Sequence, residues 1–386
     1  MKPNKTTIGA AVRKTLVVAC VTVLIASCSA TTNQANPVTN DGPVLAETNK
    51  VYGLVEGQAA ATRLRNAGTS LGYTQGKSIQ LKSLGMVMVP FDLPQDVTGK
   101  QAITDLEAAV PQSTVGVNHA YQLQNILSQS TVKSYANPLL NWPQGGCQAQ
   151  RPIGLIDGGI DTAAIARNGV TLQQRSFVTP TVQGLRHGTE TAQVIVDPTR
   201  ITNPTVFSAN VVSQTEDGAV LASATKIVEA LDWLVANDVR VANVSLAGPF
   251  NKLLALGVMS AAKRDLVLVA AAGNDRRVAS VQYPAALPDV IAVTAIDARK
   301  RAYRTAVRGD HIDLAAPGVD IFVGDDAEGR FVTGTSMAAP FVSALLAIQP
   351  QLDVASLTQS GLDLGQSGKD PVFGYGLVQA GAGCTN

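Results

Sequence analysis

From residue 152 onward, short apolar runs alternate with segments of helical periodicity, and this alternation restricts the fold more than any other feature of the chain. The runs are apolar at successive positions, which is typical of parallel strands buried on both faces. The segment 226–237 places its apolar side chains on one helical face, as a helix packed on a sheet does. The predicted strands occupy residues 153–156, 239–244, 266–271 and 290–295. The sequence therefore predicts an α/β unit over residues 151–386, with a parallel sheet and helices on both faces.

A smaller unit precedes this sheet, at residues 48–124. Its strand-like and helical segments follow the order β-α-β-β-α-β, which is that of a small ferredoxin-like α+β domain. The predicted strands are 50–55, 78–81, 85–91 and 115–117, and the predicted helices are 57–66 and 100–109. Residues 125–150 are rich in Ser, Asn, Gln, Gly and Pro and are expected to form a linker.

Residues 1–27 are expected to form an export signal. Basic residues precede an apolar stretch that is too short to span a bilayer. The stretch ends in Leu-Ile-Ala-Ser-Cys, which resembles a bacterial lipobox, where the cysteine (here Cys28) becomes the lipidated first residue. An ordinary signal peptide followed by a chance cysteine is the alternative. With Ser29 after the cysteine, the resemblance favours a protein anchored by lipid to the outer membrane of a Gram-negative bacterium, with residues 28–47 as a polar tether.

Two cysteines remain once the signal has left with Cys20 and lipid has been added to Cys28. These are Cys147 and Cys384, and in an oxidising compartment we expect them to pair. A disulfide that closes so long a loop stabilises the fold by at most about 5 kcal/mol. Two unpaired buried thiols are the alternative.

Composition excludes several classes of function. The formal net charge of +1 gives no support for nucleic-acid binding. No Cys/His spacing resembles a zinc site, and no Asp- and Asn-rich loop has the spacing of a calcium site. The sequence therefore predicts no metal and no cofactor, and a structural calcium ion has no support in it.

Ser336 is the strongest candidate for a nucleophile. It lies in Gly-Thr-Ser-Met-Ala-Ala-Pro at residues 334–340, after a short apolar segment and before the apolar run 341–347. This pattern predicts a strand, a tight turn and a helix start. At a helix N-terminus, free backbone N–H groups and the helix dipole favour a developing negative charge.

His187 and Asp157 are the candidates for a base and for the acid that orients it. His187 stands at the start of a helical pattern, and imidazole takes up a proton near neutral pH. Asp157 ends the first buried strand, at the edge where open α/β sheets build their sites. Taken singly, the histidine is explained by a structural or exposed position and the aspartate by a tight turn. Together with Ser336 they supply the three groups of nucleophilic catalysis.

Over residues 152–380, the chain resembles the subtilisin-like serine peptidases. The runs Asp-Gly-Gly-Ile-Asp at 157–161, His-Gly-Thr at 187–189 and Gly-Thr-Ser-Met-Ala-Ala-Pro at 334–340 match the three motifs of that family. The resemblance implies a serine endopeptidase that cleaves protein or peptide substrates through an acyl-enzyme. Asp157, His187 and Ser336 would form its catalytic triad.

The resemblance also implies roles for other residues. Ala-Ala-Ala-Gly-Asn at 270–274 matches the segment that carries the oxyanion-hole asparagine, here Asn274. A turn residue after a strand is the alternative for Asn274. The strand that pairs with the substrate backbone would be formed by Ser245, Leu246, Ala247 and Gly248.

Two positions depart from the family pattern. Glu190 stands where a second histidine is usual, and its carboxylate would either raise the pKa of His187 or face solvent. Ala247 stands where glycine is frequent, so its methyl group would narrow the substrate groove.

The unit at residues 48–124 resembles the pro-domains of the same family, which assist folding and inhibit the enzyme with their C-terminal tail. Residues 117–123 would be that tail, and self-processing would occur in or just before the linker. The chain would then bind its own pro-domain as a partner. A permanently attached accessory domain is the alternative.

Two other functions are alternatives to an active peptidase. One is a non-catalytic binding or chaperone lipoprotein on a peptidase scaffold, which the loss of a triad residue would favour. The other is an α/β-hydrolase esterase, which needs Gly-x-Ser-x-Gly and the chain order Ser, acid, His. Ala338 occupies the fifth position of that motif and the order is different, so the esterase is set aside.

Overall fold

The computed structural model describes residues 44–123, 126–127, 135–166, 169–179, 186–214, 220–275, 281–324, 329–351 and 354–381. The predicted signal peptide, Cys28, most of the predicted tether and Cys384 lie outside these ranges. Among the helices within the ranges, none combines the length and the apolar character that a membrane crossing needs.

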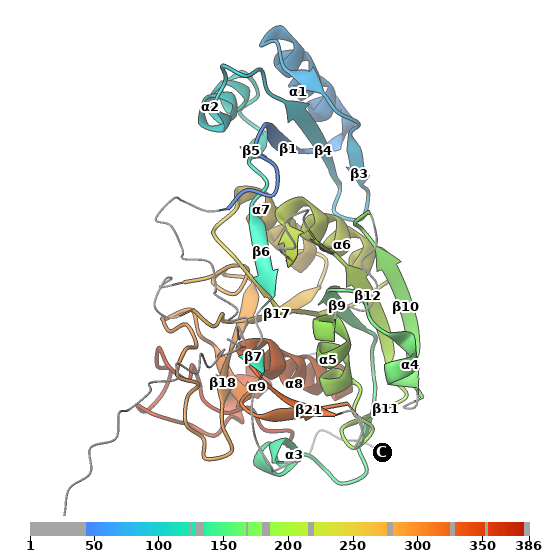
Figure 1. The fold of residues 1–386 in the computed structure, drawn as a ribbon, viewed down its shortest axis with the longest axis vertical. Helices are drawn as coiled ribbons and strands as arrows, with labels where there is room; N and C mark the ends of the chain where they lie inside the picture. The colour runs from blue at the N-terminus through green and yellow to red at the C-terminus, as the bar shows by residue number, and fades with distance from the viewer. Residues whose placement is uncertain are drawn as a thin grey trace, which may run out of the picture. The chain divides into compact units, whose positions relative to one another are not determined.

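The first folded unit is a small antiparallel sheet with two helices, shown in blue and cyan in Figure 1. Its elements are β1 (Lys50–Glu56), α1 (Gly57–Ser70), β2 (Thr74–Gln75), β3 (Ile79–Leu81), β4 (Met86–Asp92), α2 (Gly99–Ala109) and β5 (Thr114–Gly116). The strand order is β2-β4-β1-β5, and β3 also pairs with β4. Apart from the short β2, this is the element order expected from the sequence.

Both faces of this small sheet are buried. On β4, Val87, Val89 and Phe91 pack with residues of α1 and α2. The alternate residues Met86 and Met88 point to the other face and join a core that contains residues of α6 and α7. The strand period of two explains the apolar sequence of β4, because each face needs its own set of apolar side chains.

The second unit is built on a seven-stranded sheet in which every neighbouring pair is parallel. Its strands are β9 (Ile153–Asp157), β10 (Thr171–Ser176), β12 (Thr205–Asn210), β15 (Val241–Val244), β17 (Val267–Ala271), β18 (Val290–Ile296) and β19 (Leu314–Pro317). Their order in the sheet is β10-β12-β9-β15-β17-β18-β19. The predicted parallel sheet is confirmed.

Helices cover both faces of this sheet, as Figure 1 shows. α6 (Ala224–Ala236) and α7 (Lys252–Ala262) lie on one side. α5 (Arg186–Ile195) and α8 (Thr335–Ile348) lie on the other. Every residue of α8 is buried, which explains why its sequence is apolar all round instead of amphipathic.

Short strands at the edge of this unit form three further sheets. A four-stranded sheet has the order β13-β14-β6-β16, a three-stranded sheet has the order β20-β21-β7, and β11 pairs with β8. These strands are β6 (Ala120–Leu123), β7 (Ile126–Leu127), β8 (Cys147–Gln148), β11 (Ile201–Thr202), β13 (Val212–Gln214), β14 (Val220–Ser223), β16 (Leu246–Ala247), β20 (Ile321–Val323) and β21 (Arg330–Thr333). The remaining helices are α3 (Ala136–Leu139), α4 (Thr162–Ile165) and α9 (Val354–Gln359).

The second half of the predicted linker over residues 125–150 contains short elements that pack on the second unit. α3 and β8 lie in this range, and the side chains of Leu140 and Trp142 are buried in the main core. Two large apolar side chains therefore anchor a segment whose polar composition suggested an open connection. Cys147, also buried here, is disulfide-bonded.

Candidate active site

The start of α8 positions Ser336. β21 runs into Gly334, and the helix begins at Thr335, so Ser336 lies in the first turn as its sequence predicts. The Ser336 side chain is fully buried in the chain as folded. Pro340, four residues later, has no N–H to donate to the Ser336 carbonyl. Ser245 takes over this role, because its Oγ donates to the Ser336 carbonyl oxygen at 3.0 Å.

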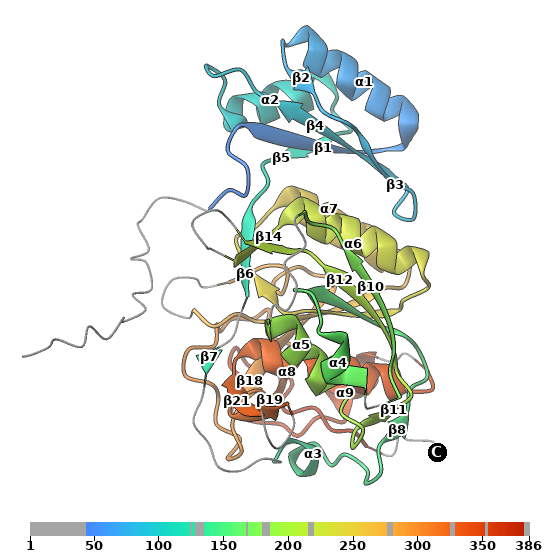
Figure 2. The same ribbon diagram turned by 45° about the vertical axis from the view of Figure 1, so that its right-hand side comes forward.

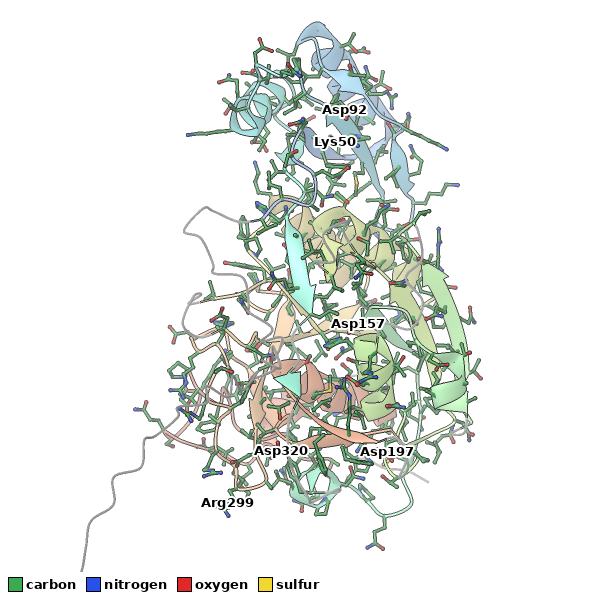
Figure 3. All side chains as sticks on the ribbon, in the orientation of Figure 1. Lys50, Asp92, Asp157, Asp197, Arg299 and Asp320 are labelled. Atoms are coloured by element: carbon green, nitrogen blue, oxygen red, sulfur yellow. The ribbon has the colours of Figure 1, made fainter. Side chains whose placement is uncertain are left out.

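Asp157 and His187 form a buried pair. Asp157, which is labelled in Figure 3, is the last residue of β9, and His187 stands in the first turn of α5. His187 Nδ1 lies 2.8 Å from Oδ1 and 3.0 Å from Oδ2 of Asp157. Asp157 is 0% exposed and His187 is 7% exposed. A carboxylate in this position holds the proton on Nδ1, so Nε2 is left as the basic nitrogen.

The packing of three elements brings the candidate residues to one end of the sheet. α5 packs against α8 and β9, and Figures 1 and 2 both show the two helices side by side. Gly188 permits the close approach of α5, because a Cβ at this position would lie 2.3 Å from the carbonyl oxygen of Gly158. His187 Nε2 is buried and has no hydrogen-bond partner among the described residues. The arrangement therefore provides an available basic nitrogen on the helix that packs beside the one carrying Ser336.

Asn274 is tied to the residue that precedes Ser336. Its Oδ1 accepts hydrogen bonds from Thr335 N at 2.9 Å and from Thr335 Oγ1 at 3.0 Å. Thr335 Oγ1 in turn accepts from Gly273 N at 3.1 Å, and Gly273 has φ of 104°, which favours glycine. Since the carboxamide oxygen is engaged by Thr335, the NH₂ group is the end of Asn274 that can serve an oxyanion.

The position of Glu190 excludes one of the two alternatives that the sequence left open for its carboxylate. Its side chain is only 5% exposed, so the alternative in which it faces solvent is wrong. Arg330, at the start of β21, donates from Nε to Glu190 Oε1 at 2.6 Å and completes an ion pair with the same oxygen. A buried carboxylate needs such a partner to offset its desolvation. The pair connects the helix that carries His187 with the strand that leads to Ser336.

Two short strands that follow the small sheet in sequence, β6 and β7, pair with strands that lie beside the candidate residues. β6 lies between β14 and β16 and pairs antiparallel with both of them. β7 then pairs antiparallel with β21, where Leu127 faces Val332 and Ile126 faces Thr333. β6 therefore lies along β16, and β7 lies along β21, which ends at Thr333, three residues before Ser336.

The four residues predicted to bind substrate divide into two groups. Leu246 and Ala247 pair with Leu123 and Gln122 of β6, as a substrate-binding strand would. Gly248 packs against a side chain of β6, whereas Ser245 supports the Ser336 backbone. The second wall of the groove, β14, and the β21 edge were not predicted, because such short strands carry no periodic signal of their own.

The other two histidines lie away from the Asp157–His187 pair in sequence. His119 Nδ1 is 3.2 Å from Asn251 Nδ2, and burial lowers the pKa of the imidazole. Burial also lowers the pKa of His311, in the loop before β19. No group of three or more His, Cys, Asp or Glu side chains within the described ranges is arranged to hold a metal ion.

Parts of the chain are similar to known proteins. Residues 153–361 match the model of the subtilase family, peptidase S8. The minor extracellular protease Epr of Bacillus subtilis (strain 168) is 33% identical over 171 residues, which cover 42% of this chain and 26% of that protein. Subtilisin DY of Bacillus licheniformis is 29% identical over 262 residues, which cover 62% of this chain and 92% of that protein.

A solved structure has a similar fold. The crystal structure of fervidolysin from Fervidobacterium pennivorans superposes with a TM-score of 0.70 at 19% identity and covers 89% of this chain and 63% of that one. Among the sequence relatives, the match spans 26% of the Epr protein and 56% of subtilisins J and E, which come from Geobacillus stearothermophilus and Bacillus subtilis (strain 168).

Proposed function

The chain belongs to the subtilase family, and from this premise we propose that it is a serine endopeptidase with Asp157, His187 and Ser336 as its catalytic triad. One observation carries the proposal. The buried Asp157 carboxylate holds His187 through Nδ1 and leaves Nε2 available, on a helix that packs against α8, where Ser336 lies. The non-catalytic alternative does not require this arrangement.

The mechanism follows from the chemistry of these groups. His187 Nε2 takes the proton of Ser336 Oγ, and the oxygen attacks the carbonyl carbon of the scissile peptide. Asn274 Nδ2 and the Ser336 N–H donate hydrogen bonds to the oxyanion that forms. His187 then gives its proton to the leaving amine, and water hydrolyses the acyl-enzyme. Asp157 stabilises the imidazolium during both steps.

Labelling with a fluorophosphonate tests the proposed nucleophile. We expect the probe to label the wild-type protein on Ser336 and to fail with Ser336→Ala. Asn274→Ala should retain labelling but lower kcat by about 100- to 1,000-fold, the range known for this donor in a subtilisin. A folded, processed protein that neither reacts with the probe nor cleaves a peptide would support the non-catalytic alternative.

Self-processing is the second part of the proposal. The pairing of β6 with β16 and of β7 with β21 supports it. Leu123 pairs with Leu246, the residue after the one that binds the Ser336 carbonyl, and Ile126 pairs with Thr333 at the end of β21. We propose that the bond cleaved lies between Leu123 and Ile126, at the C-terminal end of the predicted pro-domain, residues 48–124. N-terminal sequencing of the processed protein should begin within residues 124–126, and Ser336→Ala should remain uncleaved. A mature N-terminus elsewhere would contradict this cleavage site.

The lipoprotein character of the precursor is the third part. We propose that the protein is exported and that Cys28 is lipidated, as the sequence of residues 24–28 indicates. Metabolic labelling with a fatty acid should mark the precursor and be lost in Cys28→Ser. After self-processing the label should stay with the N-terminal fragment, and label on the catalytic unit instead would contradict the proposed order of events.

A further inference from the structure

Residues 44–47, here called the tether end, pair with the segment that leads into β6. Ala120 N donates to the Val44 carbonyl oxygen at 2.9 Å, and Ala46 N donates to the Asn118 carbonyl oxygen at 2.7 Å. The two bonds flank an antiparallel bridge. The end of the predicted tether therefore forms a short strand beside the predicted inhibitory tail, although the two are far apart in sequence.

Both edges of the tail are occupied in this arrangement. Backbone groups point to alternate sides along a strand, so Asn118 and Ala120 face the tether end while the residue between them faces the other way. The carbonyl oxygen of that residue, His119, accepts from Ala224 N at the start of α6, at 3.1 Å. β16 pairs with the tail only from Gln122 onward. Without the tether end, the backbone groups of Asn118 and Ala120 would lose these partners.

Glu47 connects the tether end to a side chain of the tail. Its Oε2 accepts from Asn118 Nδ2 at 2.9 Å and from the Tyr52 hydroxyl, and its Oε1 pairs with Lys50 at 3.1 Å. Although burial acts to raise it, the pKa of Glu47 lies below its usual value because Tyr52, Asn118 and Lys50 donate to the carboxylate. A carboxylate only accepts hydrogen bonds, so it fixes the NH₂ group as the end of the Asn118 carboxamide that faces it.

The carboxamide oriented in this way binds the second unit. Asn118 Oδ1 accepts from Thr225 N at 3.2 Å, and Asn118 Nδ2 donates to Thr225 Oγ1 at 3.1 Å. Thr225 lies in the first turn of α6, where a backbone N–H has no acceptor within the helix. Asn118 is only 2% exposed, so water does not compete for these bonds. A continuous set of hydrogen bonds thus leads from the tether end through the tail to α6.

We propose that the tether end is a working part of the inhibitor: it holds the tail extended and Asn118 correctly oriented, and so slows the release of the N-terminal fragment after cleavage. The proposal rests on the proposed self-processing. The physical basis is preorganisation, because a tail that is already held as a strand loses less conformational entropy when it binds. Since the tether end is continuous with the segment that contains Cys28, membrane anchoring and inhibition would depend on the same strand.

Two substitutions in the full-length precursor test the proposal. Glu47→Gln removes the charged acceptor of Asn118, and Ala46→Pro removes the N–H that donates to the Asn118 carbonyl. With either one, we expect peptidase activity to recover about 5- to 10-fold faster after processing, the effect of one hydrogen bond. Glu56→Gln is the matched control, because Glu56 is an exposed carboxylate at the end of β1. Recovery at the rate of this control in both variants would overturn the proposal.

Hydrogen exchange separates the proposal from the proposed function and from a general loss of folding. In the full chain carrying Ser336→Ala, the amides of residues 118–123 should exchange faster with Glu47→Gln or Ala46→Pro, while those of β4 should not change. Equally faster exchange in β4 would mean that the whole small sheet is loosened, which overturns the proposal. If no peptide is cleaved but exchange changes only in the tail, the peptidase proposal fails and the role of the tether end stands. If peptides are cleaved while exchange and recovery match the control, the role of the tether end alone fails.

Discussion

At the scale of single residues, the nucleophile is positioned by polar atoms that lie outside the Asp-His-Ser set. Ser245 replaces the helical hydrogen bond that Pro340 removes from Ser336. Asn243 Nδ2 donates to Ser245 Oγ at 2.9 Å, and Ser343 Oγ donates to Asn243 Oδ1 at 3.2 Å. These groups are fully buried, so each one depends on the next for its hydrogen bond.

Ser245→Ala tests this support. The substitution leaves the Ser336 carbonyl without its donor, and we expect the free energy of unfolding to fall by about 1–3 kcal/mol. Because the carbonyl belongs to the nucleophile itself, kcat should fall by roughly 10-fold. Ser343→Ala is the control. It removes a buried hydroxyl on α8, the helix of Ser336, and this hydroxyl lies two hydrogen bonds further from the Ser336 carbonyl than the Ser245 hydroxyl does. The free energy of unfolding in urea and the kcat for a peptide substrate would be measured for both variants. An equal loss of kcat in the two would contradict the positioning role of Ser245.

At the scale of secondary structure elements, β21 connects two parts of the structure. One edge pairs with β7, and its end leads through Gly334 into α8. Arg330 at its start is bound to Glu190 on α5. This ion pair connects two elements that each carry one proposed catalytic residue, so a disturbance of β21 should affect their relative position.

Glu190→Gln should therefore reduce both stability and activity. The amide leaves the partly buried Arg330 without its counter-charge, and we expect a loss of about 1–3 kcal/mol in the free energy of unfolding, less than for a fully buried pair. A double-mutant cycle with Arg330→Gln measures the coupling, which should be at least about 1 kcal/mol. Additive effects of the two substitutions, determined by urea unfolding, would show that the two side chains act independently.

At the scale of the whole chain, the two folded units share a core. Tyr52, Leu54, Met86 and Met88 of the small sheet belong to the same apolar cluster as residues of α6 and α7. Polar contacts also join the two units. Asp232 on α6 accepts hydrogen bonds from the backbone N–H groups of Ser83 and Leu84, at 2.7 and 2.9 Å. Lys252 on α7 pairs with Glu107 at 2.6 Å.

Asp232→Ala should loosen the first unit from the second. It removes a charged acceptor from two backbone donors, and we expect the dissociation rate of the cleaved N-terminal fragment to rise by about 10-fold, which corresponds to the typical 1.5–3 kcal/mol of such bonds reduced for solvent exposure. Asp289→Ala, which removes an exposed carboxylate from the catalytic unit, is the control. Recovery of peptidase activity after processing reports the dissociation. Equal recovery in the two variants would contradict the role of Asp232.

The predicted strands agree closely with the structure where apolar residues are continuous. β9, β17 and β18 lie within one residue of the segments 153–156, 266–271 and 290–295. β10 was not predicted, because it is an edge strand with exposed polar residues and has no apolar run. Glu190 could not be assigned either, since its partner Arg330 is 140 residues away.

Periodicity and short motifs are local properties of the chain, so they were sufficient to predict the parallel sheet, its helical cover and the three residues proposed for catalysis. They do not record which distant groups meet in the fold. The Ser245 hydroxyl at the Ser336 carbonyl, the Arg330–Glu190 pair and the Asn118–Thr225 hydrogen bonds all join residues at least 91 positions apart. Such contacts arise when loops close and layers pack, and their energies depend on burial and geometry that no local pattern records.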